Sequence, residues 1–503
     1  MTDKPHRVLK VQSSEEGITL LGLGPGDPTL LTRRAWAWLG AIEKLYLRTI
    51  HHPTVAHLPP HLEVESFDDL YEDADSFETV YTAIIEEILV VGKTSGVTYA
   101  VPGHPFVAEA TCPEIARRAK AAGIPLQVID GLSFLEPTFK ALGLDPFPNL
   151  VLVDAIEVMQ RQTPGFPPSS PALIAQIYDR DVAAEVKLTL MSAYPDEHPV
   201  VLVHAAGTGD EVVEYLPLHA VDKSPHLGLL SSLFVPSLSP QASFEAFQEV
   251  IARLRAPDGC PWDREQTHLS LRPFLLEEAY EALDALDRGD MEDLAEELGD
   301  LLLQIVLHAQ IASEEGDFNI HTVIEGIASK LIRRHPHVFS EVDVAGVEGV
   351  IRNWEQIKAE ERQAHGVPEK NGLLDGVPAA LPALSQAEQI IERVGRVGFS
   401  HLALLGEPGA IRKMLAAFEG AEEANKMKTL GELLLGVTGL AHQAGIDAES
   451  ALREALTRFR KRFGAMEAQA LTSGQALMDL SKDEQKRLWE AAGNESVGGK
   501  VGS

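Results

Sequence analysis

The sequence predicts a multidomain protein in which an N-terminal α/β domain is followed by all-α helical modules. Its 503 residues suggest about three domains, because a domain typically holds ~150 residues. Short apolar runs alternate with helical stretches through 17–222, which is typical of an α/β domain. From Phe244 onward the strand patterns vanish and apolar residues recur at helical spacing, which indicates an all-α region.

The α/β domain follows a polar N-terminal tail, residues 1–16, and its strands alternate with helices. The expected strands are Ile18–Leu23, Val97–Val101, Leu126–Ile129, Leu150–Val153 and Val200–His204. Helical stretches follow the first two strands at 29–39 and 106–121, and Gly123 is a stop signal for the second. Residues 223–243 are rich in Ser and Pro without periodicity, so we expect a linker there.

The helical region divides into two related modules. The helices expected in the first module, 244–364, are 244–255, 271–288, 291–314, 321–334 and 347–364. A second linker, 365–384, leads to a second module at 385–470 and a C-terminal tail at 471–503. The run LGDLLL at 298–303 matches LGELLL at 430–435, so we infer a duplicated module.

The charge excludes some partners. With 43 basic and 75 acidic residues the net charge is −32, which argues against a nucleic acid polymer as partner because that needs a basic face. It leaves room for nucleotides, because bound Mg²⁺ can reverse the local sign. Two cysteines make no disulfide framework, and no signal core or stretch of ~18 apolar residues occurs. We therefore expect a cytoplasmic protein with no membrane partner.

Four carboxylates form the strongest candidate site. Glu278 and Glu281 are three positions apart, as are Glu297 and Asp300, so each pair projects from one helical face. A turn at 287–290 would bring the pairs face to face. Asp300 lies in an apolar run, where like charges are costly unless a cation compensates them. Oxygen ligands favour Mg²⁺ or Mn²⁺, whereas the alternative is a solvated acidic helix surface.

Basic and aromatic residues recur around these carboxylates. Cations and a metal suit the phosphates of a nucleoside triphosphate, and a tryptophan suits its base. The candidate substrate-binding residues are Trp262, Gln266, Lys330, Arg333, Arg334, Trp354 and Lys358. The alternative is that the tryptophans are core residues and the arginines pair with surface acids.

These motifs carry a resemblance. GCPWD at 259–263, EEAYE at 277–281, ELGDLLLQIV at 297–306, RRHPHVF at 333–339 and NWEQIK at 353–358 closely resemble the MazG family of nucleoside triphosphate pyrophosphohydrolases. The resemblance implies an oligomeric all-α fold that hydrolyses nucleoside triphosphates to monophosphate and pyrophosphate with Mg²⁺. It also implies that the four carboxylates are the metal ligands, with Glu277 adjoining them.

The second module departs from the MazG pattern. Thr429 and Glu432 stand where the first module has Glu297 and Asp300. The simplest interpretation is a degenerate module that serves packing or dimerisation. We expect a homo-oligomer, a dimer, formed through the helical modules.

A glycine-rich turn, Gly22–Pro28, follows the first expected strand. It is neither a G-x-G-x-x-G motif nor a P-loop, and on its own it is as consistent with a rigid turn as with a ligand site. With PGHP at 102–105 and DGLS at 130–133, it resembles the tetrapyrrole methylase family. The resemblance implies two α/β lobes with S-adenosylmethionine between them. The implied cofactor-binding residues are Gly22, Gly24, Pro25, Gly26, Asp27, Pro102, Gly103 and His104.

One residue departs from the methylase pattern, since the family usually has Gly-Asp-Pro where this chain has His104. Three hypotheses remain open. The chain is a bifunctional enzyme with a methyltransferase domain, a pyrophosphohydrolase whose N-terminal domain only binds a ligand or regulates, or a non-catalytic nucleotide sensor. The presence of all four carboxylates favours catalysis.

Overall fold

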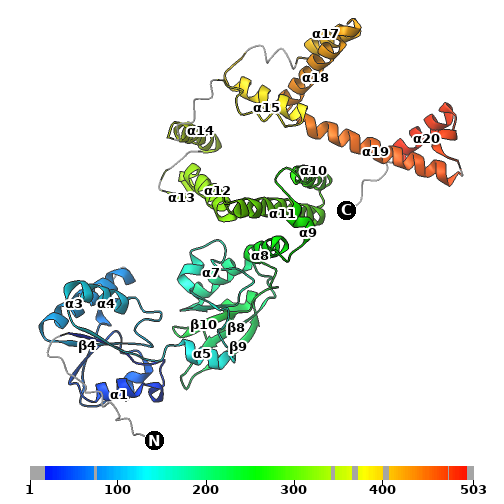
Figure 1. Ribbon diagram of the computed structural model, residues 1–503. Helices are drawn as coiled ribbons and strands as arrows, with labels where there is room; N and C mark the ends of the chain where they lie inside the picture. The colour runs from blue at the N-terminus through cyan, green and yellow to red at the C-terminus, as the bar shows by residue number, and fades with distance from the viewer. Residues whose placement is uncertain are drawn as a thin grey trace. The chain divides into compact units, whose positions relative to one another are not determined.

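The computed structural model describes residues 17–72, 76–340, 342, 346–364, 372–399, 407–473 and 475–495. The chain divides into two compact units, with the division between Arg253 and Leu254 (Figure 1). The first unit is α/β and the second is helical, so the predicted fold class is confirmed. The predicted tail 1–16 lies outside the described residues.

The first lobe of the α/β unit is built on a five-stranded parallel sheet. In spatial order its strands are β3 (Glu63–Ser66), β2 (Lys44–Leu47), β4 (Val97–Val101), β1 (Ile18–Gly22) and β5 (Leu126–Ile129). Its helices are α1 (Arg33–Leu39), α2 (Asp69–Glu72), α3 (Phe77–Thr94) and α4 (Thr111–Ala122), with the 3-10 turns η1 (Pro28–Leu30) and η2 (Pro53–His57). All five residues of β1 are buried, because α3 and α4 contribute to the core on one face of the sheet and α1 on the other.

The second lobe holds a mixed five-stranded sheet. Its strands, in spatial order, are β6 (Val151–Asp154), β7 (Ala172–Ala175), β10 (Ser231–Val235), β8 (Pro199–His204) and β9 (Val212–Pro217). The helices are α5 (Leu135–Leu142), α6 (Ala155–Met159) and α7 (Arg180–Met191), with the 3-10 turn η3 (Leu218–Lys223). Leu202 and Leu233 pack with α7 in the largest core of the chain, and Val201 and Val203 pack with α5 on the opposite face.

The predicted linker 223–243 is wrong. It contains β10, which pairs antiparallel with β7 and β8 in the middle of the second sheet. Leu233 and Val235 are fully buried there, so this segment completes the core of the lobe. Two further boundaries differ, because the predicted helix 29–39 divides into η1 and α1, and the predicted helix 106–121 begins only at Thr111.

In the second unit every regular element of the described residues is helical. The first module and its approach comprise α8 (Phe244–Arg255), α9 (Pro261–Glu265), α10 (Arg272–Arg288), α11 (Met291–Glu315), α12 (Ile320–Arg334), α13 (Pro336–Phe339) and α14 (Gly346–Ala364). The second comprises α15 (Ala383–Arg396), α17 (Pro408–Glu419), α18 (Lys426–Gln443) and α19 (Ala448–Thr472), with the 3-10 turn η4 (Glu423–Asn425). The five helices expected in the first module match α8, α10, α11, α12 and α14 within one residue at each end.

The C-terminal segment 471–503 is not a simple tail. The structure places the 3-10 turn η5 (Leu477–Asp479) and α20 (Lys482–Glu495) there, and α20 packs against α19. The Trp489 ring lies 5.1 Å from the Phe459 ring and beneath the Arg462 guanidinium, which explains why these residues fold back. In the part of the chain that the structure describes, no helix is long and apolar enough to cross a membrane.

The α10–α11 hairpin forms through local capping. Gly289 ends α10 in the left-handed conformation, with φ of 68°, which glycine adopts without a steric penalty. Asp290 then caps α11 by accepting a hydrogen bond from the Asp293 backbone N–H at 3.2 Å. Arg288 bridges the turn through ion pairs with Asp284 and Asp293. The predicted turn 287–290 is therefore present, and α10 packs along α11.

Candidate functional site

The hairpin brings three of the predicted carboxylates together. One carboxylate oxygen from each of Glu278, Glu281 and Glu297 lies within 4.8 Å of the others, and among the described residues this is the one such group of three or more metal-ligating side chains. Glu278 and Glu281 come from α10, and Glu297 comes from α11. Glu277 is an exposed neighbour and is not a member of this group.

The carboxylates perturb one another. Partial removal from water raises the pKa of Glu278 above its usual value, and the charges of Asp300 and Glu281 raise it further. Removal from water also raises the pKa of Glu297, with added repulsion from Glu281 and Asp293. Asp300, half-buried one turn beyond Glu297, thus contributes its charge to the group without being one of the three oxygens within 4.8 Å.

This donor set fits a hard divalent cation. It consists of oxygens alone, and its members repel each other where they stand. A cation among them would convert that repulsion into attraction. The carboxylates therefore form a candidate Mg²⁺ or Mn²⁺ site.

A second group joins four of the predicted substrate-binding residues, at the end of α12 and on α14. The Lys358 ammonium lies 4.4 Å from the centre of the Trp354 ring, and the Arg334 guanidinium lies 6.0 Å from it. Arg333 and Arg334 both bind the carboxylate of Glu361, a residue that the sequence analysis missed. The sequence pattern anticipated the cations and the ring but not their acidic partner.

The other predicted substrate-binding residues lie elsewhere. The Trp262 ring packs edge-on against Phe274 at 6.1 Å and remains 54% exposed. The Gln266 amide donates to the Trp262 carbonyl at 3.0 Å, so it supports the turn after α9. Lys330 is exposed on α12. No contact recorded among the described residues joins these three to the Trp354 group.

In the α/β unit, the predicted cofactor loops meet at the carboxyl ends of β1, β4 and β5. Gly24 and Gly103 exchange backbone hydrogen bonds of 3.2 and 2.8 Å. A Cβ on Gly22 would lie 2.5 Å from the Gly103 carbonyl oxygen, and one on Gly131 would lie 2.2 Å from the same atom. Glycine is therefore required for this close approach of three loops, at the edge where parallel sheets bind ligands.

The side chains of these loops have local roles. Asp27 caps η1 through Thr29, which lowers the pKa of the carboxyl. His104 accepts a hydrogen bond from the Phe106 N–H at 3.0 Å, and its other ring nitrogen lies 3.7 Å from Asp130. Pro102 and Gly103 continue directly from β4, and Pro25 lies against Gly207 of the second lobe.

The glycine-rich turn also touches the second lobe and a buried histidine. The Asp27 N–H donates to the Gly207 carbonyl at 3.2 Å, and Gly26 lies against Thr208. Beside the turn His52 is buried, which lowers its pKa to about 4, and its Nδ1 has no hydrogen-bond partner in the structure. A crowded glycine cradle and an unpartnered buried polar atom are features that suit a bound ligand.

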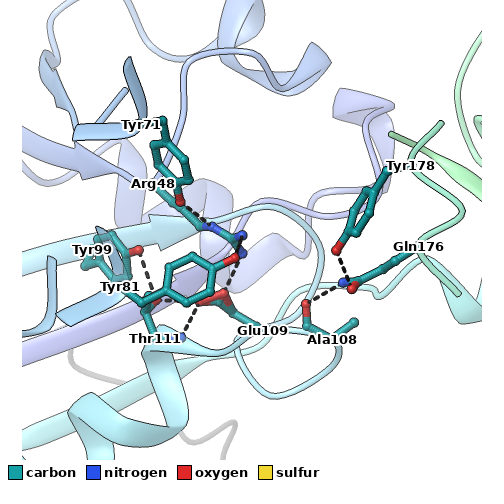
Figure 2. Close-up of polar contacts among 9 residues, drawn as sticks. All are labelled: Arg48, Tyr71, Tyr81, Tyr99, Ala108, Glu109, Thr111, Gln176 and Tyr178. Carbon is teal, nitrogen blue, oxygen red and sulfur yellow. Dashed lines mark hydrogen bonds and ion pairs between the residues drawn. The ribbon is translucent and has the colours of Figure 1, made fainter. Parts of the chain in front are cut away.

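A polar cluster that sequence reasoning missed lies at the same edge of the first sheet (Figure 2). Arg48 follows β2 and pairs with Glu109, whose side chain is 1% exposed, at 2.7 Å. The same guanidinium donates to the hydroxyls of Tyr71 at 3.3 Å and Tyr81 at 3.2 Å. Glu109 also accepts from the backbone N–H and the hydroxyl of Thr111. The charge pair is thus enclosed by hydrogen bonds.

Beside this cluster two strained residues connect the lobes. Ala108 and Gln176 have φ of 51° and 66°, in the left-handed region that non-glycine residues seldom adopt. The Gln176 amide donates to the Ala108 carbonyl at 3.3 Å and accepts from the Tyr178 hydroxyl (Figure 2). Backbone strain of this kind often marks a functional site.

Comparison with known proteins identifies both parts. Residues 266–339 match the family model described as the MazG nucleotide pyrophosphohydrolase domain. Residues 17–222 match the model for tetrapyrrole (corrin/porphyrin) methylases. YabN of Bacillus subtilis (strain 168), an uncharacterized protein, is 38% identical over 485 residues, which cover 94% of this chain and 98% of YabN. The chain belongs to the MazG family.

Other members of the MazG family resemble one half of the chain. The nucleoside triphosphate pyrophosphohydrolase/pyrophosphatase MazG of Thermotoga maritima is 39% identical over 250 residues, covering 50% of this chain and 95% of that protein. The nucleoside triphosphate pyrophosphohydrolase of Escherichia coli (strain K12) is 36% identical over 255 residues, covering 49% of this chain and 96% of its own. A uroporphyrin-III-C-methyltransferase from Thermus thermophilus aligns with 44% of this chain and 92% of its own at 21% identity and a TM-score of 0.33. Both predicted family resemblances are confirmed.

Proposed function

We propose that the helical unit hydrolyses nucleoside triphosphates to nucleoside monophosphate and pyrophosphate with Mg²⁺. The observation that carries this proposal is the group of Glu278, Glu281 and Glu297, which repel one another until a divalent cation binds. The names of the Thermotoga and Escherichia relatives support the substrate class. In this proposal Asp300 completes the set of ligands.

The chain's own residues would divide the work at the α-phosphorus. Mg²⁺, when bound, neutralises phosphate charge and polarises the P–O bonds. A carboxylate oxygen that does not hold the metal orients the attacking water and takes its proton. The α–β bridging bond then breaks and pyrophosphate leaves. Arg333, Arg334 and Lys358 are suited to stabilise the charge on the departing pyrophosphate.

The test compares the two modules. We expect Glu281→Gln to abolish Mg²⁺-dependent pyrophosphate release from nucleoside triphosphates. Glu432→Gln should leave that release largely intact, because Glu432 is exposed and lies 4.0 Å from Lys428 rather than in a carboxylate group. Pyrophosphate release is measured with ATP, GTP, CTP and UTP, with Mg²⁺ and with EDTA. Equal loss in both variants would rule out the assignment of the site to the first module.

For the α/β unit we propose S-adenosylmethionine binding at the three glycine loops, with methyl transfer as the activity. Gly22, Gly103 and the neighbouring Gly131 would let the cofactor approach the backbone, and the buried Nδ1 of His52 offers an additional polar partner. Calorimetric titration of the full chain with S-adenosylmethionine tests this directly. If no heat or affinity is detected, the α/β unit has a structural or regulatory role instead.

We also propose that the protein is a cytoplasmic homodimer formed through its helical modules. Apolar side chains are exposed along α11 and α12, including Leu298, Ile305, Ile327 and Leu331. A partner copy would remove these side chains from water. Light scattering after size-exclusion chromatography should give twice the chain mass of 54.6 kDa; a monomer at micromolar concentration would contradict the proposal.

A further inference from the structure

Glu361 connects the two arginines at the end of α12 to α14. Its Oε1 accepts from the Nε of Arg333 at 2.6 Å, and its Oε2 accepts from the Nε and Nη2 of Arg334 at 3.2 and 2.6 Å. The side chains of Glu361 and Arg334 are only 15% and 13% exposed. The hydrogen bonds from Arg334, and then from Arg333, lower the pKa of Glu361 to about 2. The carboxylate is therefore ionised at neutral pH and holds both guanidinium groups.

The geometry of this contact leaves the outer edges of the arginines available. Glu361 takes the Nε of each guanidinium and one terminal nitrogen of Arg334. Among the described residues, no hydrogen bond recorded in the structure engages either Nη of Arg333 or the Nη1 of Arg334. A guanidinium has five N–H donors in a fixed plane, so fixing the Nε edge also fixes the direction of the remaining donors. Terminal N–H pairs in that arrangement match phosphate oxygens.

Without a carboxylate at this place the cations would repel one another. Arg334 and Lys358 both lie over the Trp354 ring, at 6.0 and 4.4 Å, and Arg333 is the chain neighbour of Arg334. Three like charges would favour extended, solvated side chains before substrate arrives. Glu361 offsets this repulsion while occupying the donors that point away from the open edge.

We propose that Glu361 is a positioning residue for the triphosphate, holding Arg333 and Arg334 with their terminal nitrogens directed at phosphate oxygens. This inference rests on the proposed pyrophosphohydrolase function. Glu361 does not touch the substrate in this arrangement and acts through the arginines. Its effect is on phosphate binding, so it is the same for every base.

The experiment measures hydrolysis and binding by the full chain. Glu361→Gln should raise KM for ATP and for CTP by about tenfold, because each arginine loses a charge-assisted hydrogen bond that orders it. We expect kcat to remain within about twofold, since the carboxylates on α10 and α11 are unchanged. Calorimetry with α,β-methylene-ATP, which cannot be cleaved between the α- and β-phosphates, should show the same loss of affinity.

Two further variants separate positioning from general damage to the fold. Glu361→Asp keeps the charge and should recover part of the affinity. Glu360→Gln is the matched control, because Glu360 is exposed and accepts only from Gln356 in the recorded contacts, at 3.0 Å; it should bind like the wild type. Thermal melting of all three variants identifies one that has failed to fold.

Each remaining outcome decides the question. A lower KM in Glu361→Gln would mean that the carboxylate competes with phosphate, and an unchanged KM would mean a surface ion pair; both overturn the inference while leaving hydrolysis intact. If the wild type binds the analogue through Glu361 but hydrolyses nothing, the inference survives and the proposed activity fails. A wild type that does not bind the analogue contradicts both.

Discussion

Substituting Glu278 should make the protein more stable without metal and less responsive to metal. At 4.8 Å, the limit that encloses the three carboxylate oxygens, two unit charges repel by about 0.9 kcal/mol even in bulk water. Glu278→Gln removes this repulsion between Glu278 and Glu281 while keeping the size of the side chain. The helical unit, Leu254–Ser503, should therefore gain about 1 kcal/mol, which corresponds to a Tm increase of about 2–4 °C.

Mg²⁺ should reverse the order of the two proteins. A ligand at 100 times its Kd stabilises a folded protein by about 2.7 kcal/mol, and the wild type should receive most of this while Glu278→Gln receives little. The assay is differential scanning calorimetry of the full chain in EDTA and across a Mg²⁺ titration. Glu325→Gln, an exposed carboxylate removed from α12, is the matched control and should follow the wild type in both conditions.

The pH dependence supplies an independent check of the sign. The pKa of Glu278 is raised above its usual 4.5, so ionisation disfavours the folded state. The penalty is fully present above the raised pKa and disappears as the pH falls below 4.5, where the carboxyl is protonated in both states. The Tm difference in EDTA should thus be largest near pH 7 and vanish near pH 4. A lower Tm for Glu278→Gln in EDTA, or an equal response of both proteins to Mg²⁺, would refute the reasoning.

Three further substitutions test other contacts. Arg48→Met leaves the buried Glu109 carboxylate uncompensated and should cost about 3 kcal/mol in urea unfolding monitored by tyrosine fluorescence, whereas Arg48→Lys should cost less. Gly22→Ala places a Cβ 2.5 Å from the Gly103 carbonyl oxygen and should abolish S-adenosylmethionine binding in calorimetry while leaving pyrophosphate release unchanged. Arg453→Met removes a guanidinium that lies over an aromatic ring of α10, and should lower the unfolding free energy of the helical unit by about 1 kcal/mol in urea titration.

The sequence predicts what is local and periodic. The helices of the first module match their predicted ranges because amphipathic spacing and the caps at Gly289 and Asp290 are encoded within a few residues. The strand β10 escaped prediction because its serines and flanking prolines resemble a linker. Only its pairing with β7 and β8, both distant in sequence, makes it a central strand.

The same distinction applies to the sites. Glu278 and Glu281 could be predicted to share a face because helical spacing fixes their relation, and one hairpin turn suffices to add Glu297. The pair of Arg48 and Glu109 spans 61 residues, so no pattern in the sequence connects them. Glu361 was missed for a related reason, because its partners lie on another helix and nothing in α14 itself distinguishes it from Glu360.

The two helical modules differ in how their charges are balanced, and this difference indicates why a degenerate module is retained. In the first, carboxylates raise one another's pKa, so the hairpin is destabilised by its own candidate site. In the second, Glu432 lies 4.0 Å from Lys428, and the Thr429 hydroxyl bonds to carbonyls of its own helix. The second module thus carries no such penalty. It also contributes Arg453, on α19, to the surface of α10. A module freed from holding metal can support the hairpin that still has to.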